Sequence, residues 1–166
     1  MSRARQRQIF DHFKDRVYSL ALRYTNDPDD ASDLAQEIFL KIFQGFPSFR
    51  AQAKLDTWIY RIAMNTCIDR QRRKKRLLQL DENALITDFD PCAAGEEAEM
   101  MTMVQRAVTE LPDGTRESIV LRYVNGCSYK EIAEILGSPP GTIAARISRG
   151  HQMLRKKLAH LREWVR

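Results

Sequence analysis

The sequence predicts an all-α protein of two small helical domains, three helices in the first and four in the second, joined by an acidic linker. Apolar residues recur at the three- to four-residue spacing of amphipathic helices in both halves of the chain. Turn-forming residues interrupt this spacing, and helices are expected to end where they do so. The interruptions fall at 25–28, 45–47, 111–114 and 137–140.

The distribution of charge divides the chain in the same way. Residues 1–76 contain sixteen Lys and Arg against nine Asp and Glu, whereas residues 106–166 contain eleven against six. Residues 77–105 contain seven acidic residues and no Lys or Arg. We therefore expect basic domains at 1–76 and 103–166, and an acidic linker at 77–102 between them. Basic domains attract phosphate backbones, which repel an acidic linker. A solvated spacer without a role of its own is the alternative for the linker.

Each expected helix of the first domain has one apolar side. The first helix carries apolar residues at every fourth position: Ile9, Phe13, Val17 and Ala21. Asp29 or Asp30 is expected to cap the second helix, which runs to about Gln44. The third helix is expected to begin at about Leu55 and to continue into the basic run at 70–76.

The second domain is expected to contain a helix-turn-helix. A helix near 103–111 is followed by one from about 115 to 124, whose Ile119, Val120 and Tyr123 are expected to face inward. Two shorter helices then flank 137–140, where Gly and paired Pro end one helix and begin the next. Two short helices across such a turn form a helix-turn-helix, whose second helix enters the major groove of DNA.

The second of these helices has two chemically different sides. At about 100° per residue, an apolar stripe faces the core. This stripe consists of Ile143, Ile147, Leu154, Leu158 and Leu161. Arginine on the other side can donate two hydrogen bonds to guanine, and alanine can pack on a thymine methyl group. With one lysine of the preceding helix, that side forms the predicted recognition face: Lys130, Thr142, Ala145, Arg146, Arg149 and Gln152. An ordinary amphipathic surface helix is the alternative, but the preceding helix and turn favour DNA.

The third helix of the first domain mixes basic and aromatic residues. This mixture suits single-stranded DNA, because bases stack on rings while phosphates meet cations. The loop with Phe49, Arg50 and Gln52 is expected to hold an extruded base. Trp58 is expected in the core, and Tyr60 is expected to add aromatic surface. We name the candidate contacts the basic-aromatic face: Phe49, Arg50, Arg61, Asn65, Arg72 and Arg73. A basic run that is merely solvated is the alternative.

The second helix of the first domain places a leucine among polar residues. We name this set the Leu40 face: Asp33, Gln36, Glu37 and Leu40. An acidic face with an apolar centre suits a basic partner surface. Single exposed apolar residues are common, however, so the residues by themselves favour an incidental leucine.

Other functions are not expected from this sequence. It contains neither the roughly 20 apolar residues of a membrane span nor a secretory signal, so a cytoplasmic protein without membrane insertion is expected. Cys67, Cys92 and Cys127 are too far apart for a disulfide framework or a zinc site, and Cys67 and Cys127 are expected in the core. The acidic residues at 29–33 are explained by capping, and the His and Ser residues form no catalytic framework. Neither an enzyme nor a cofactor is expected.

Two blocks of the chain resemble one family. DLAQEIFLKIF at 33–43 and TWIYRIAMNTCIDRQRRKKR at 57–76 resemble region two of extracytoplasmic-function sigma factors. LPDGTRESIVLRYVNGCSYKEIAEILGSPPGTIAARISRGHQMLRKKL at 111–158 resembles their region four. The order of the blocks, their spacing and the short connector all agree, so the resemblance covers nearly the whole chain.

The resemblance implies a transcription initiation factor with several partners. It implies that the Leu40 face docks on the β′ clamp helices of core RNA polymerase, which gives the exposed leucine a partner, and that the β subunit is contacted too. It also implies that the basic-aromatic face recognises and opens the minus-ten element, and that the recognition face reads the minus-thirty-five element. The linker is implied to thread a basic polymerase channel. An anti-sigma protein, often membrane-bound in this family, is implied as inhibitor.

One departure and one rival interpretation follow. Ala144-Ala145 stand where the family frequently has a polar pair, so selectivity is expected to depend on Arg146, Arg149, methyl contacts and DNA shape. The rival is a stand-alone helix-turn-helix activator or repressor. Such a protein would need a dimer surface and a sensing domain, and the first domain shows no ligand-pocket pattern.

Overall fold

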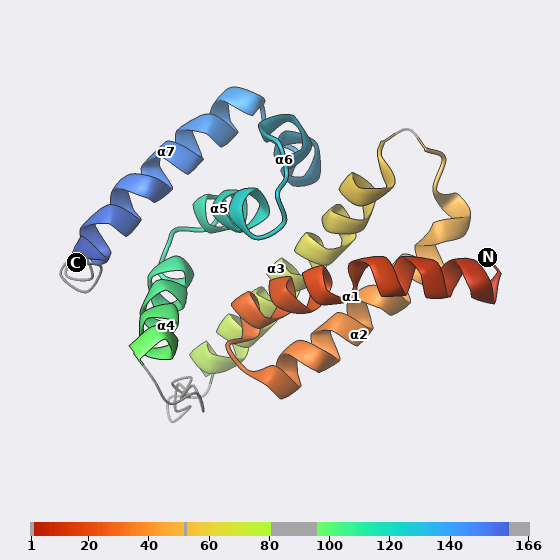
Figure 1. Cartoon of the computed structure of the whole chain (residues 1–166), viewed down its shortest axis with the longest axis horizontal. Helices are drawn as coiled ribbons and strands as arrows, with labels where there is room; N and C mark the ends of the chain where they lie inside the picture. Colours follow the sequence, from red (N-terminus) through yellow and green to blue (C-terminus); the bar gives the residue numbers. More distant parts are fainter. Residues whose placement is uncertain (1, 52, 81–95, 160–166) are drawn as a thin grey trace. The chain divides into compact units, whose positions relative to one another are not determined.

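The protein is all-α and divides into two compact units, Met1–Thr87 and Asp88–Arg166. The computed structural model describes residues 2–51, 53–80 and 96–159, and these ranges contain seven α-helices, one 3-10 turn and no strand (Figure 1). The predicted fold class is confirmed. Within the segment predicted as linker, helix occupies the first residues and the last, whereas Asp81, Glu82, Asp88 and Asp90 lie outside the described residues.

The first unit contains three long helices around an apolar core. Helix α1 spans Arg3–Thr25, α2 spans Pro28–Gly45 and α3 spans Leu55–Leu80. Figure 1 shows α1 and α2 side by side, and α3 packs against both. The largest fully buried side chains of this unit come from all three helices: Val17, Leu20, Leu34, Ile38, Ile42, Ile59 and Met64.

The prediction that Asp29 or Asp30 caps α2 is wrong. The cap is Asp27, whose Oδ1 accepts a hydrogen bond from the backbone N–H of Asp30 at 2.8 Å. Pro28 takes the first helical position because it has no N–H to satisfy there. The cap is therefore the residue directly before Pro28. Asp29 and Asp30 instead lie in the first turn, where the positive end of the helix dipole stabilises their charges.

Two aromatic residues of α3 differ from their expected environments. Tyr60 was predicted to add aromatic surface, but it is only 2% exposed and packs edge-to-face on Phe13 at 6.1 Å between ring centroids. Trp58, predicted to be core, is half-buried under the connection to α2, with its ring 5.1 Å from that of Phe49. The buried side of α3 therefore includes Tyr60 and faces α1 more than predicted.

The described part of the second unit contains four helices, of which α5 and α6 are the shortest. Helix α4 spans Glu96–Thr109, α5 spans Thr115–Tyr123, α6 spans Tyr129–Leu136 and α7 spans Pro140–Lys157. Helices α4, α5 and α6 all contact α7. Apolar side chains from all four helices are buried in this unit: Ala107, Val108, Ile119, Val120, Leu121, Ile132, Ile135, Ile143 and Ile147.

A glycine allows α5 and α7 to approach closely. Gly150 is buried on the apolar stripe of α7, and a Cβ atom there would lie 2.8 Å from Cγ1 of Ile119. Leu154 and Leu158 continue the stripe as half-buried residues, and Leu161 lies outside the described residues. The close approach at Gly150 fixes where α7 crosses the unit.

Candidate nucleic-acid and partner interface

The helix-turn-helix is defined by well-formed caps. At the start of α6, the Ser128 N–H donates to Oε2 of Glu131 at 2.9 Å, and the Glu131 N–H donates to Ser128 Oγ at 3.3 Å. This reciprocal pair satisfies two otherwise free N–H groups. Gly137 ends α6 in the left-handed conformation at φ 60°, and Pro140 opens α7. The turn predicted at 137–140 is confirmed.

Most of the predicted recognition face lies together on exposed surface. Thr142, Ala145, Arg149 and Gln152 are exposed along one side of α7. Lys130 is exposed near the start of α6. Their roles in DNA binding stay a prediction, but the side of the helix they occupy is available to a duplex.

Arg146 is set apart from that group. It is half-buried, and one terminal guanidinium nitrogen donates to Ser138 Oγ at 3.2 Å. The guanidinium also lies against Gly114, where a Cβ atom would be 3.0 Å from Arg146 Cζ. The arginine therefore points back onto its own unit, although the helical periodicity placed it with the exposed residues.

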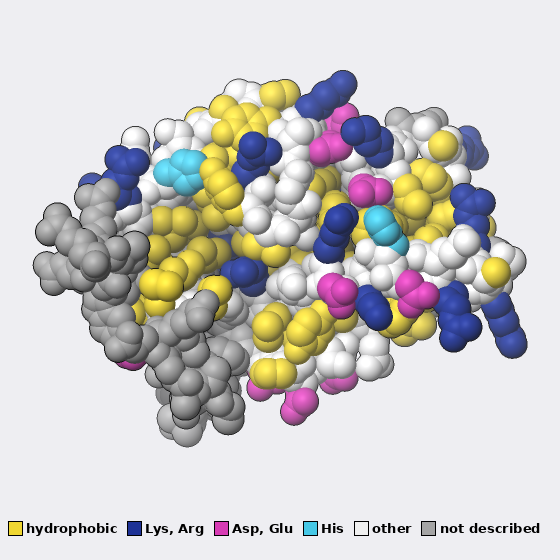
Figure 2. All heavy atoms as spheres, in the orientation of Figure 1, with side chains coloured by type: hydrophobic (Ala, Val, Ile, Leu, Met, Phe, Trp, Pro, Cys, Tyr) yellow, Lys and Arg dark blue, Asp and Glu magenta, His cyan; other side chains and the backbone are white. Residues whose placement is uncertain are grey.

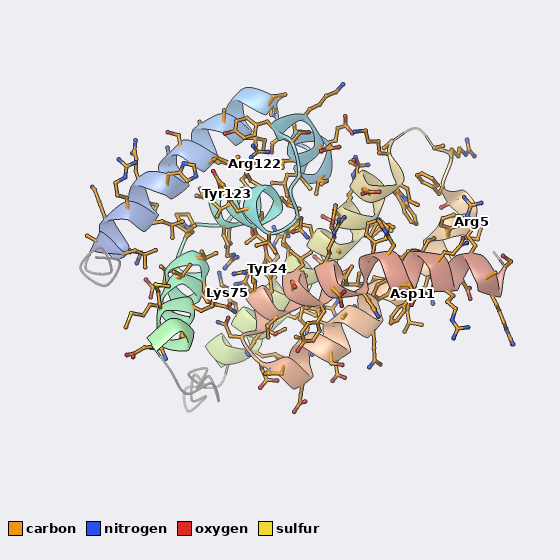
Figure 3. The ribbon with its side chains drawn as sticks, viewed as in Figure 1. Arg5, Asp11, Tyr24, Lys75, Arg122 and Tyr123 are labelled. Carbon is orange, nitrogen blue, oxygen red and sulfur yellow. The ribbon has the colours of Figure 1, made fainter. Side chains whose placement is uncertain are left out.

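The structure also reveals an exposed aromatic group that the sequence analysis missed. Tyr123, predicted to face inward, is 60% exposed, and its hydroxyl lies 2.7 Å from His151 Nε2 on α7. Arg122 beside it donates to the Cys127 carbonyl at 3.1 Å and stacks over Tyr129 (Figure 3). The inward assignment of Tyr123 was wrong because its ring lies beside the exposed His151 of α7, 5.4 Å between ring centroids, instead of in the core. No signal in the sequence pointed to this pairing.

The arginines and Asn65 of the predicted basic-aromatic face are exposed, whereas its Phe49 is half-buried in a ring cluster. Arg61, Asn65, Arg72 and Arg73 are all exposed on α3. Phe46 and Phe49 pack with Trp58 at the other end of this helix, where Arg50 is exposed. Ala51 has a positive φ of 55°, a conformation that an alanine adopts only at a cost. Gln52 lies outside the described residues.

The N-terminal end of α1 adds cations to this cluster. The guanidinium carbon of Arg5 lies 5.3 Å from the centroid of the Phe46 ring. Figure 3 labels Arg5 near the N-terminus of α1. Figure 2 shows Lys and Arg side chains gathered around this end of α1. The sequence offers one signal for this contact, the alternating arginines Arg3, Arg5 and Arg7.

The Leu40 face combines an exposed apolar centre with a carboxylate, Glu37, that is paired with Lys41 of α2 and lies near Arg70 of α3. Leu40 is 60% exposed, and Asp33 and Gln36 beside it are also exposed. Glu37 forms an ion pair with Lys41 at 2.8 Å, and Arg70 of α3 approaches it to 3.9 Å. The Lys41 hydrogen bond lowers the pKa of Glu37; burial opposes this, and the charges of Lys41, Arg73 and Arg70 add to it. Glu37 is therefore held as a carboxylate.

An apolar groove between α1 and α2 continues this face. It has a volume of about 470 Å³ and shares Gln36 and Leu40 with the Leu40 face. Aromatic rings from both helices line it: Phe10, Tyr18, Phe39 and Phe43. The remaining lining residues are Lys14, Asp15, Ser32 and Ala35. Phe10 and Tyr18 are exposed although they are large and apolar. The sequence analysis missed them because α1 was judged only by its buried stripe.

The remaining chemical groups offer no site of another kind within the described ranges. Burial raises the pKa of the Cys67 thiol to about 12, with a smaller contribution from Glu37, so this buried cysteine is not a reactive thiolate. Cys127 is also buried, whereas Cys92 lies outside the described residues. No group of three metal-binding side chains is found between 2 and 159 where the chain is described. Among the helices described, none is long and apolar enough to span a bilayer.

Comparison with known proteins identifies the family. Residues 9–77 match Sigma-70 region 2, and residues 101–154 match Sigma-70 region 4. The ECF RNA polymerase sigma factor SigW of Bacillus subtilis is 38% identical over 165 residues, which cover 92% of this chain and 88% of SigW. The ECF RNA polymerase sigma-E factor of Escherichia coli K12 is 34% identical over 161 residues, which cover 90% of this chain and 84% of that protein.

The solved structures agree with the sequences. The sigma factor RpoE, crystallised in complex with the anti-sigma factor NepR from Bartonella quintana, matches with a TM-score of 0.80 and 25% identity. The match covers 92% of this chain and 96% of the other. The resemblance drawn from the two sequence blocks is confirmed. The chain belongs to the extracytoplasmic-function (ECF) RNA polymerase sigma factors.

Proposed function

We propose that this sigma factor binds core RNA polymerase in the cytoplasm, directs it to specific promoters and helps to open them. The observation that carries the proposal is that one chain contains both regions, each with its own exposed surface. A region-two unit exposes a basic helix beside a ring cluster, and a region-four unit exposes a recognition helix. Two weak DNA contacts on one tethered chain act together, because the first raises the effective concentration of the second.

The two units are proposed to bind different forms of DNA. The exposed side of α7 suits the major groove of an upstream duplex, where Thr142, Arg149 and Gln152 reach base edges. The basic-aromatic face suits the opened strand downstream, because rings accept unstacked bases and arginines meet phosphates. Captured bases offset the lost stacking, which costs a few kcal/mol per base, so opening needs no ATP.

The Leu40 face and the groove beside it are proposed to dock on polymerase. An exposed leucine continuous with an aromatic groove supplies the apolar centre of an interface, and Asp33 supplies charge at its rim. The β′ clamp helices are the proposed partner. An inhibitor is proposed as well, since the similar RpoE was solved with the anti-sigma factor NepR.

A binding assay with core polymerase tests the docking face. Leu40→Asp is expected to abolish co-elution of the chain with core enzyme, because it places a charge at the apolar centre of the interface. Leu77→Asp is the matched control, since Leu77 is 66% exposed on α3 and outside the face, and it is expected to co-elute normally. Unfolding caused by Leu40→Asp would place this leucine in the core instead.

Run-off transcription tests the function itself. Purified core enzyme is incubated with and without the chain on fragments of the native genome. Promoter-dependent transcripts are expected only when the chain is present. The rival interpretation, a stand-alone repressor or activator, predicts duplex binding without co-elution and without transcripts, and that outcome would refute the proposal.

A further inference from the structure

The two arginines of the recognition face occupy different environments. Arg149 is exposed on α7, one turn beyond Ala145. Arg146 is half-buried, donates to Ser138 Oγ at 3.2 Å and lies against Gly114. A side chain that already has a hydrogen-bond acceptor and a packing surface must give up both before it can reach DNA.

Both partners of Arg146 are anchored by their own hydrogen bonds. Gly114 begins α5 with φ at 80°, its N–H donates to the Glu117 carboxylate, and its carbonyl accepts from Ser118 Oγ at 2.6 Å. The Ser138 N–H donates to the Ala133 carbonyl at 3.1 Å, which places this serine at the end of α6. The Arg146 guanidinium therefore contacts two fixed points, the end of α6 and the turn before α5.

The position of Arg146 gives the bridge a geometric consequence. Arg146 lies in the second turn of α7, close to Thr142 and Ala145, whereas the packing of Gly150 on Ile119 holds the helix one turn further along. The buried Ile143 and Ile147 hold this part of α7 against the core, and the Arg146 contacts add a polar attachment beside them. Because Ala144 and Ala145 offer no side-chain hydrogen bonds, base reading depends on how accurately the remaining side chains are aimed.

We propose that Arg146 is a positioning residue, which ties the start of α7 to the Ser138 and Gly114 turns and contacts neither base nor phosphate. It sets the angle at which Thr142 and Arg149 meet the duplex. The inference rests on the proposed function of the second unit as the reader of the upstream element. It assigns Arg146 a role different from the direct contact that the sequence analysis predicted.

The test compares variants of the chain assembled with core polymerase on a randomised duplex library. Arg146→Ala is expected to weaken binding to the preferred sites roughly tenfold, about the value of one hydrogen bond to a charged group. Because Thr142 and Arg149 would both be misaimed, its base preference is expected to fall at several base pairs together, whereas its dependence on salt concentration is expected to match that of the unaltered chain. Arg149→Ala is the comparison, and it is expected to lose preference at one or two base pairs.

Ser138→Ala keeps the arginine but removes its acceptor. It is expected to weaken binding and lower base preference in the same way, and the double variant is expected to be no weaker than Arg146→Ala, because the two residues share one contact. Hydrogen exchange of α6 and α7 at the assay temperature establishes that each variant is folded. Ser138→Ala also keeps the test decisive if Arg146→Ala does not fold.

Three results would overturn the inference. Loss of preference at a single base pair in Arg146→Ala would make this arginine a base reader. A salt dependence reduced by about one unit of slope would make it a phosphate contact. Binding unchanged in Ser138→Ala would show that the tether has no effect. Failure of the proposed function looks different: the unaltered holoenzyme would then select no upstream sequence.

Discussion

The two units reach stability by different means. The first contains helices of 23, 18 and 26 residues around large buried side chains. In the second, α5 and α6 have only 9 and 8 residues, too few to be stable by themselves. These short helices depend on a reciprocal cap, on the Arg146 bridge and on a glycine contact. We therefore expect the first unit to be most sensitive to cavities in its core and the second to small changes at its turns and crossings.

The largest effect is expected from a cavity in the first unit. Ile38 is fully buried on α2, so Ile38→Ala removes packed atoms that its surroundings cannot replace. We expect the free energy of unfolding of this unit to fall by about 2–5 kcal/mol. Hydrogen exchange read by mass spectrometry, with urea titration, measures α1–α3 separately from α4–α7. Leu40→Ala on the same helix is the control, with a change within about 0.5 kcal/mol.

A glycine substitution is expected to have the next largest effect. In Gly150→Ala, the added Cβ would lie 2.8 Å from Ile119 Cγ1, so α5 and α7 must separate. We expect a loss of about 1–3 kcal/mol in the second unit, despite the better helix propensity of alanine. Gly141→Ala is the matched control on the same helix, since no heavy atom lies within 4 Å of its Cβ position. If both variants are equally stable, the crossing does not depend on close packing.

Loss of the α6 cap is expected to cost less. Ser128→Ala removes the hydroxyl that accepts from the Glu131 N–H, and such caps contribute about 1 kcal/mol. Faster hydrogen exchange confined to α6 is the expected readout. Ser148→Ala, at an exposed position within α7, is expected to change exchange little. Equal protection of α6 in the two variants would mean that packing alone holds this helix.

The smallest effect concerns pH and belongs to the first unit. The pKa of Glu37 is lowered in the folded state, mainly by the Lys41 hydrogen bond. As pH falls through the usual glutamate range, the unfolded chain therefore binds more protons than the folded chain. The stability that Glu37 contributes is fully present above that range and is lost as pH falls through the lowered pKa. Urea midpoints from pH 6 to about pH 3 measure this. Glu37→Gln is expected to flatten the slope, and a slope as steep as that of the unaltered chain would contradict it.

Much of the fold and part of the site could be predicted from the sequence because both depend on local periodicity. The helix-turn-helix turn, the exposed position of Leu40 and the exposed side of α7 all follow from which residues share a helical face. The capping prediction for α2 failed by two or three residues, because it left Pro28 outside the helix, whereas Pro28 takes the first helical position.

The sequence by itself determined which helices form and where the middle of each buried face lies, since apolar and polar residues alternate with the helical period. Only the tertiary structure decided the residues at the edges of those faces. Tyr60 is buried because α1 lies over it, and Tyr123 is exposed because it lies beside His151 at the edge of α7. Arg146 is held inward by Ser138 and Gly114. An edge residue can turn either way, so its environment depends on where the neighbouring helix crosses, and a single helical period does not encode that crossing.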